Sequence, residues 1–354
     1  MTRIGVMTFL HNDNYGSILQ AWALQRTLTE LGFEAEHIDY APSRAEKLRN
    51  LILSGNSPSL ILEGIRKRSA TGKMHGGFGE FRKEQLALSG RCADRAALRR
   101  AAEQYDVLMC GSDQIWSPVW LNPAYFLDFT DRPKVAYAPS LGVKELPEKR
   151  KQRRIARLVQ PFGSVSVREA EGAALLRAMA GIDAPVLPDP VMLMPQEAWR
   201  GLTSGDVPQE PYVLCYFIGD APRYWEAAKT AGEALDAPVR VIPRTEAARQ
   251  SGFLLEENVP PQRWLALIAG AARLVTDSFH GAAFAAILNV PCTIVRRYRE
   301  DDPESKNSRI DQLLRSLGTD RLEQETWPQV NEAIARLSAE GRKWLLDAVS
   351  QAAQ

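Results

Sequence analysis

The 354-residue sequence contains only four cysteines, and their spacing suits neither a metal site nor a disulfide scaffold. Cys92, Cys110, Cys215 and Cys292 form no CxxC or CxxxH pair. No apolar run reaches the roughly 18–20 residues of a membrane span, and residues 1–3 lead into an expected strand instead of a signal peptide. We therefore expect a cytoplasmic protein without a metal centre.

Two nucleotide-binding patterns are missing as well, and so is an excess of one charge. Neither the GxxxxGK[ST] phosphate loop nor the GxGxxG fingerprint occurs, which removes the usual sequence support for nucleotide hydrolysis and dinucleotide redox chemistry. The net charge is only +1, so we expect no nucleic-acid partner. An anionic ligand would have to be held by a local arrangement of residues.

Strand-like and helix-like segments alternate along a chain of ordinary composition, with 45% hydrophobic residues. Residues 3–9 are typical of a buried strand, residues 15–31 of a helix, and residues 33–40 of the next strand. A second series begins at residue 212. Such alternation predicts parallel sheets covered by helices on both faces.

The pattern divides into two Rossmann-like domains, as the length of the chain allows. The first covers residues 1–195 and includes an insertion at about 44–79, rich in Ser, Gly, Lys and Arg, that is expected to be mobile. The second covers residues 205–354. Its last long helix, near residues 330–352, is expected to be able to pack back on the first domain.

Polar turns follow several of the expected strands, at residues 11–15, 111–116, 166–169 and 276–280. In open parallel sheets, ligands bind outside the carboxyl ends of the strands. We therefore expect these turns to face a ligand.

The segment TDSFHGAAF, residues 276–284, carries the sharpest signal. Asp277, Ser278 and His280 occupy the turn, and Gly281 allows the next helix to pack closely and to offer backbone N–H groups to an anion. Histidine titrates near neutral pH, so His280 could act as a general acid or base, with Asp277 to orient it. The alternative is that Asp277 or Ser278 only caps the helix and that His280 is a first-turn surface residue.

Other motifs admit a structural interpretation as readily as a functional one. The turn GSDQIW is typical of a capped helix with a core tryptophan, and Arg168 in SVRE could be an ion-paired surface residue. Arg309 could simply lie in the first turn of a helix capped by Ser308. The basic run 149–154 could touch an anionic membrane surface or form a solvated helix face.

Taken in order, the motifs resemble the polysaccharide pyruvyl transferase family over about residues 4–320. The segments that carry the resemblance are IGVMTFLHNDNYGSILQAWALQRTL, CGSDQIWSP, YFLDF, VAYAPSLG, SVREAEGA, DPVMLM, VTDSFHGAAFA and SRIDQLLRSLG. The resemblance implies a GT-B-like α/β fold, in which two Rossmann-type, doubly wound parallel-sheet domains face each other across a cleft.

The resemblance also implies a reaction: transfer of a pyruvyl group from phosphoenolpyruvate to a saccharide, commonly as a ketal, in the synthesis of exopolysaccharide of the cell envelope. No cofactor or metal is implied, because phosphoenolpyruvate is itself the donor substrate. The acceptor would be a lipid-linked or nucleotide-linked saccharide, reached at the inner face of the membrane with a possible peripheral contact of the helix near residues 147–160.

The resemblance assigns roles to residues of both domains. The first domain would form the acceptor side and the second the donor side, with Arg168 reaching the donor from the first. The expected catalytic residues are His280, Asp277 and Asp113; the expected donor ligands are Arg168, Ser278, Gly281, Arg244 and Arg309; the expected acceptor ligands are Asn12, Asp13, Asn14, Tyr15 and Ser112.

One position departs from the family pattern. Several members have an arginine two residues before the histidine, as in S-R-L-H, where this chain has Ser278. Arg244, Arg296 or Arg309 could supply the missing charge, or the donor could differ. A glycosyltransferase that uses a nucleotide-sugar and a non-catalytic saccharide-binding partner therefore stay open as alternatives, and so does an enol ether as the product.

Overall fold

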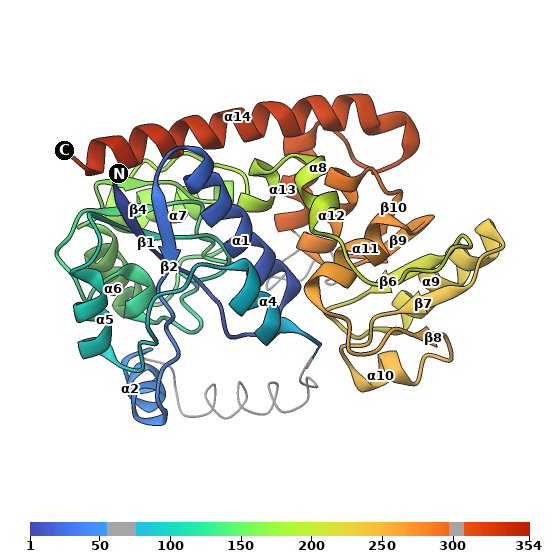
Figure 1. Cartoon of the computed structure of the whole chain (residues 1–354), viewed down its shortest axis with the longest axis horizontal. Coiled ribbons are helices and arrows are strands. Elements are labelled where there is room, and N and C mark those ends of the chain that lie inside the picture. Colours follow the sequence, from blue (N-terminus) through green and yellow to red (C-terminus); the bar gives the residue numbers. More distant parts are fainter. Residues whose placement is uncertain (55–75, 297–307) are drawn as a thin grey trace.

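The computed structural model describes residues 1–54, 76–296 and 308–354 (Figure 1). The central part of the expected insertion, residues 55–75, lies outside this range. On either side of it the chain forms helix α2, Arg44–Ser54, and helix α4, Phe78–Gln85. Among the described residues, no helix is both long and apolar enough to cross a membrane.

The first half of the chain forms a parallel five-stranded sheet in the order β2-β1-β3-β4-β5. This order places the crossover point between β1 and β3, where ligands of doubly wound sheets bind. Its strands are β1 (Arg3–Met7), β2 (Glu34–His37), β3 (Val107–Cys110), β4 (Lys134–Ala136) and β5 (Ser164–Val165), and its helices include α1 (Tyr15–Glu30), α5 (Arg95–Ala102), α6 (Lys149–Val159) and α7 (Ala170–Ala180).

The second half forms another parallel sheet, in the order β10-β9-β6-β7-β8. Its strands are β6 (Val213–Tyr216), β7 (Val239–Val241), β8 (Leu254–Leu255), β9 (Arg273–Thr276) and β10 (Cys292–Ile294). The helices around it are α8 (Gln196–Leu202), α9 (Pro222–Leu235), α10 (Glu246–Arg249), α11 (Pro261–Ala269), α12 (Phe279–Leu288), α13 (Ser308–Leu317) and α14 (Trp327–Ala352).

Three short 3₁₀ helices complete the described structure: η1 (Pro123–Phe126), η2 (Pro190–Leu193) and η3 (Gln324–Thr326). Helix η2 lies between the two halves of the chain in sequence and contacts α1, α12 and α14. It thus ties elements of both sheets together.

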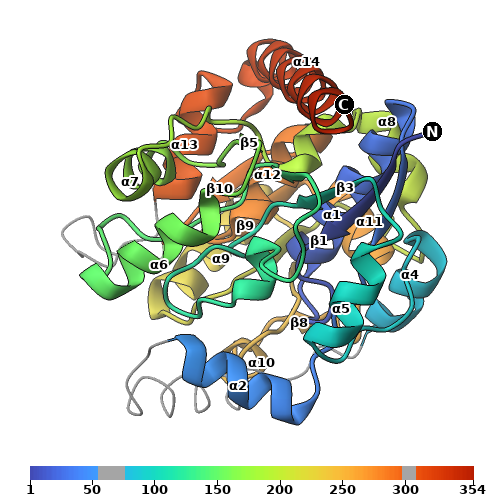
Figure 2. The ribbon, with the colours of Figure 1, turned by 90° about the vertical axis from the view of Figure 1, so that its left-hand side faces the viewer.

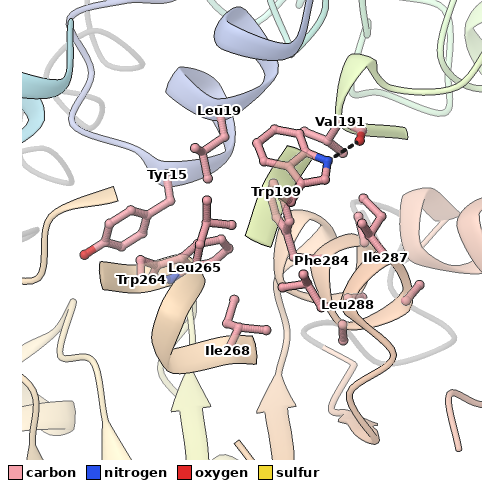
Figure 3. Packing of buried hydrophobic residues seen from close by; sticks show 14 of the residues in the cluster. Tyr15, Leu19, Val191, Trp199, Trp264, Leu265, Ile268, Phe284, Ile287 and Leu288 are labelled. Carbon is pink, nitrogen blue, oxygen red and sulfur yellow. Dashed lines mark hydrogen bonds between the residues drawn. The ribbon is translucent and has the colours of Figure 1, made fainter. Parts of the chain in front are cut away.

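An apolar cluster joins the first helix of one sheet to the helices of the other (Figure 3). The ring of Tyr15 stacks on that of Trp264 with 4.9 Å between centroids, and the Tyr15 hydroxyl donates a hydrogen bond to the Val259 carbonyl at 2.7 Å. Trp199 meets the edge of Phe284 with 4.8 Å between centroids. Burial of such aromatic groups contributes strongly to stability, so this cluster holds the two sheets in a defined relation.

Helix α14 returns from the second sheet to the first and runs along both (Figure 1). The Arg342 guanidinium lies 3.1 Å from a carboxylate oxygen of Glu30 in α1, and Ser338 donates a hydrogen bond to the Leu193 carbonyl at 3.0 Å. Gly341 lies at the closest approach: a Cβ atom there would be 2.5 Å from the Tyr137 hydroxyl. The contact therefore requires glycine.

We predict that Gly341→Ala lowers the free energy of unfolding by about 1–3 kcal/mol, because the added methyl group overpacks a rigid contact. Gly201→Ala in α8 is the matched control, since a Cβ at Gly201 meets no atom within 4 Å. Chemical denaturation measures both. Equal stability of the two variants would show that α14 adjusts freely and does not fix the two sheets.

Candidate functional site

The loops at the carboxyl ends of the two sheets meet at the start of α1. Gly16, in the first turn of that helix, lies against the imidazole of His280, which follows β9 in the other sheet. A Cβ atom on Gly16 would be only 2.0 Å from His280 Nδ1. The start of α1, directly after the polar loop at residues 11–15, and the TDSFHG segment are therefore adjacent, although they are far apart in sequence.

A buried carboxylate, Asp189, lies behind the His280 ring. Its Oδ2 atom is 3.4 Å from His280 Nε2 and accepts a hydrogen bond from Arg168 Nη1 at 2.6 Å. Ser112 Oγ donates to the same oxygen at 3.2 Å, and the Val191 N–H donates to Oδ1 at 3.1 Å. The Asp189 side chain has no exposed surface, and that of His280 is only 12% exposed.

The charges of this cluster stabilise one another. Burial opposes ionisation of Asp189, but the neighbouring His280 and Arg168 outweigh that cost and hold the pKa of Asp189 well below its usual range. Burial likewise acts to lower the pKa of Arg168, whereas Glu169 and Asp189 raise it above its ordinary value. Arg168 and Asp189 are therefore both charged.

Asp113 borders the same helix start on its other side. Its backbone is left-handed, with φ of 69°, a strained conformation for a residue other than glycine. One carboxylate oxygen accepts a hydrogen bond from Ser17 Oγ in α1 and the other from the Gln114 N–H at 2.8 Å. The Asp113 carboxylate is half-buried, so it can face a ligand while α1 holds it.

Two predicted donor ligands, Arg309 and Arg244, also reach this region. With the Gln114 amide oriented to satisfy both partners, its oxygen accepts a hydrogen bond from Arg309 Nη2 at 3.0 Å. Arg244 Nη1 lies 3.4 Å from the hydroxyl of Tyr216, whose ring meets that of Tyr15 edge-on. Both arginines are half-buried, and each contacts a residue beside the site: Arg309 contacts Gln114, next to Asp113, and Arg244 contacts Tyr216, next to Tyr15.

The structure assigns Asp277 a different position from the one expected. Its carboxylate accepts hydrogen bonds from the N–H groups of Ile218 at 2.6 Å and Gly219 at 2.8 Å, and from the Tyr224 hydroxyl at 3.1 Å. These contacts fix the loop after β6. The carboxylate that lies beside His280 is Asp189, so the prediction of Asp277 as the orienting group is wrong.

Three further predicted ligands serve the fold instead of facing solvent. Ser278 caps α12 by accepting a hydrogen bond from the Gly281 N–H at 3.2 Å, which occupies the backbone donor expected to bind an anion. Tyr15 is fully buried between the domains, and Ser112 is buried against Asp189. The predicted contacts of Tyr15 and Ser112 with the acceptor therefore do not fit this structure.

Arg168 belongs to the site but is closed off from solvent, with 3% of its side chain exposed. Its guanidinium packs over the Phe279 ring at 4.6 Å from the centroid. Its Nη2 atom has no hydrogen-bond partner among the described residues. Direct binding of the donor by Arg168 would have to use that nitrogen.

The remaining acceptor candidates lie in the loop before α1, where Asn12 is exposed and Asp13 and Asn14 are half-buried. Asn14 caps α1 through a hydrogen bond from the Ser17 N–H at 3.2 Å, and Asn12 donates to Ser17 Oγ at 3.2 Å. Asp13 lies 3.5 Å from Arg82 of α4. Of these three candidates Asn12 is thus the most exposed, and His11 in the same loop is exposed as well.

Asp189 is the site residue that sequence reasoning missed. Two local signals were present: Asp189 begins the segment DPVMLM that contributes to the family resemblance, and it is an acidic residue within the largely apolar run PVLPDPVML. An acidic residue in such a run predicts a partner but does not say which one. The described residues contain no group of three or more His, Cys, Asp or Glu side chains that could hold a metal ion.

We predict that Asp189→Asn lowers the free energy of unfolding at pH 7 by about 3–5 kcal/mol, because Arg168 loses a buried counter-charge. The folded-state pKa of Asp189 lies below its unfolded value, so this stabilisation is present at neutral pH and is lost as the pH falls below about 4. Chemical denaturation of the unmodified chain and of Asp189→Asn, from pH 7 to below about pH 4, measures the difference between their free energies of unfolding. If this difference in free energy does not become smaller in acid, Asp189 is not charged in the folded protein.

We further predict that Gly16→Ala displaces the His280 ring while the fold persists. The chain has four histidines, so the imidazole resonances can be assigned with His280→Gln and compared by NMR spectroscopy. We expect the His280 resonance to shift and the other three to stay. Gly79→Ala in α4 is the control, because a Cβ there meets only the flexible end of Arg82 at 3.9 Å. An unshifted His280 resonance would contradict the close contact.

Solved structures share this fold at low sequence identity. UDP-GlcNAc 2-epimerase from Neisseria meningitidis, bound to UDP-GlcNAc, aligns over 99% of this chain and 100% of its own, with 10% identity and a TM-score of 0.54. UDP-N-acetylglucosamine 2-epimerase from Rickettsia bellii aligns over 99% and 98%, with 10% identity and a TM-score of 0.52. At such identity the similarity shows the fold alone, and it confirms the predicted GT-B-like class.

The sequence comparisons concern the family. No curated protein matches the chain. A family model described as polysaccharide pyruvyl transferase matches residues 14–297, which include every strand of the two sheets except β1, together with Asp189 and the side chains that contact it. This range is well over half of the chain and confirms the resemblance found in the sequence motifs. The chain therefore belongs to the polysaccharide pyruvyl transferases, a family of transferase enzymes.

Proposed function

We propose that this protein transfers a pyruvyl group from phosphoenolpyruvate to a saccharide of cell-envelope polysaccharide assembly. The observation that carries the proposal is the position of His280. Its ring lies at the junction of the two sheets, between Gly16 and the buried pair of Asp189 and Arg168. A histidine held on two sides in this way is suited to proton transfer.

The donor carries a carboxylate and a phosphate, so its site requires positive groups. We assign this role to Arg309 and Arg244, which approach the start of α1 from the second domain. The α1 N-terminus adds its positive dipole end. Arg309 thereby takes the place of the arginine that the family pattern has at the position of Ser278.

The first step of ketal formation needs one proton donor and one proton acceptor, and the site offers one group for each role. Carbon 3 of phosphoenolpyruvate accepts a proton, which makes carbon 2 electrophilic, and a saccharide hydroxyl attacks carbon 2 as it loses its own proton. A second hydroxyl then displaces phosphate, which leaves with the remaining proton. We assign proton donation to His280 and proton acceptance to Asp113, because they flank the same helix start.

The acceptor side is formed by the open polar groups of the first domain. Amide and carboxylate side chains suit saccharide hydroxyls, and Asn12 and Asp13 supply them beside Asp113. The saccharide would be lipid-linked or nucleotide-linked and would be reached on the cytoplasmic side of the membrane. Neither a metal nor a redox cofactor enters this reaction.

The first test is calorimetric titration with phosphoenolpyruvate, run beside UDP- and GDP-sugars. Loss of one charge-assisted hydrogen bond weakens binding by roughly tenfold to 150-fold, so Arg309→Gln should lower phosphoenolpyruvate affinity by that factor. Arg315→Gln, an exposed arginine of the same helix, is the matched control and should change nothing. Binding of a nucleotide-sugar without binding of phosphoenolpyruvate would overturn the proposal in favour of a glycosyltransferase.

His280→Gln separates an enzyme from a saccharide-binding protein. We expect it to reduce phosphate release from phosphoenolpyruvate, measured with a panel of saccharide acceptors, by about 10²–10⁴-fold while phosphoenolpyruvate still binds. Mass spectrometry of the product distinguishes a ketal from an enol ether, since only the latter keeps the carbon–carbon double bond. Unchanged phosphate release in the variant would remove His280 from the chemistry.

A further inference from the structure

Helix α6 presents a stripe of basic side chains to solvent. Lys149, Arg150, Arg153 and Arg157 are all exposed, and their spacing places them on one face of the helix. Ile155 and Val159, on the opposite face, are buried in the first domain. Both ribbon views show α6 on the outside of the molecule (Figures 1 and 2).

Few acidic side chains balance the positive charge of this stripe. Among the described residues, no carboxylate lies within ion-pair distance of the four exposed side chains. Residues 144–157 contain seven basic and two acidic side chains, a net charge of +5, whereas the whole chain carries only +1. Burial lowers the pKa of Arg154 and, although Asp128 opposes this, repulsion from Arg150 and Arg157 lowers it further. An anionic partner would relieve this repulsion.

Three large apolar side chains lie exposed on the loops next to α6: Val119 at 45%, Trp120 at 39% and Leu146 at 46%. Trp120 donates a hydrogen bond to the Gln114 carbonyl at 3.2 Å, and the Gln114 side chain lies against Gly142, four residues before Leu146. The two loops are therefore neighbours. They follow adjacent strands, β3 and β4, and Gln114 is next to Asp113 of the proposed site.

We propose that these residues form a docking surface for an anionic lipid bilayer. This surface, which we call the α6 surface, consists of Lys149, Arg150, Arg153 and Arg157 with Val119, Trp120 and Leu146. Basic groups attract the headgroups of acidic lipids, and exposed tryptophan and aliphatic side chains enter the interface between headgroups and acyl chains.

The position of the α6 surface bears on the acceptor. Because it adjoins the loop that holds Asp113, a bilayer bound there would bring membrane-anchored saccharides to the first-domain side of the site. The inference therefore favours a lipid-linked over a nucleotide-linked acceptor, and in this respect it rests on the proposed function. A nucleic acid would be attracted by the charges but would gain little from aliphatic side chains at Val119 and Leu146.

The test is co-sedimentation of the full chain with vesicles of phosphatidylglycerol and phosphatidylcholine, compared with phosphatidylcholine alone. We expect binding only to the anionic vesicles, and release in high salt. Each basic residue near an anionic bilayer contributes about fivefold to partitioning, so Arg150→Gln/Arg153→Gln should weaken binding by about 30-fold. Trp120→Ser/Leu146→Ser should weaken it as well.

The matched control is Lys229→Gln/Lys343→Gln, which removes the same charge from exposed positions on α9 and α14. We expect this variant to bind like the unmodified chain. No binding to anionic vesicles, or an equal loss in the control variant, would overturn the docking surface. One further result would overturn it: a short oligonucleotide abolishes vesicle binding by the unmodified chain, and Trp120→Ser/Leu146→Ser binds vesicles as the unmodified chain does.

Calorimetry with phosphoenolpyruvate on Arg150→Gln/Arg153→Gln separates this inference from the proposed function. Unchanged phosphoenolpyruvate affinity together with lost vesicle binding supports both. Vesicle binding by a chain that does not bind phosphoenolpyruvate leaves the docking surface in place and removes pyruvyl transfer. Phosphoenolpyruvate binding without vesicle binding removes the docking surface and leaves pyruvyl transfer in place.

Discussion

A fully buried carboxylate is costly unless several donors surround it, and Asp189 meets this requirement with groups from distant parts of the chain. Ser112 follows β3, Arg168 follows β5, and His280 belongs to the first turn of α12 in the second domain. Their hydrogen bonds and charges are compatible only when the carboxyl ends of both sheets face each other. The need to satisfy one charge thus constrains the relative position of the two domains.

Apolar packing, independently of the buried charges, fixes the same relative position of the two domains. Tyr15 extends from the start of α1 into the second domain, where it stacks on Trp264 and bonds to the Val259 carbonyl. The next residue, Gly16, admits the His280 ring. A rotation that separated the sheets would expose Tyr15 and withdraw His280 from α1 together. Ligand entry should therefore involve the loops around Asn12 and Asp113 more than a wide opening of the domains.

The sequence was sufficient to predict the two parallel sheets, because alternating apolar strands and amphipathic helices depend on local patterns. It also predicted α1 to within a residue, because a helix was expected over residues 15–31 and α1 spans Tyr15–Glu30. The sequence did not predict which residues pair with the buried charges. Asp277 is nearer to His280 in sequence than Asp189 is, yet its oxygens bond to the loop after β6. Such pairings depend on tertiary contacts, which cannot be predicted from the spacing of residues in the sequence.

Buried hydroxyls and rings were misjudged for a related reason. Polar residues at strand ends were expected to face a ligand, but Tyr15 and Ser112 each have an internal partner for the hydroxyl and no exposed surface. The same reasoning explains the departure at Ser278. That residue is buried as the cap of α12, and Arg168 already packs over the adjacent Phe279. An arginine at this position would lack the capping hydroxyl, and in our proposal the positive charge for the donor comes from α13, through Arg309.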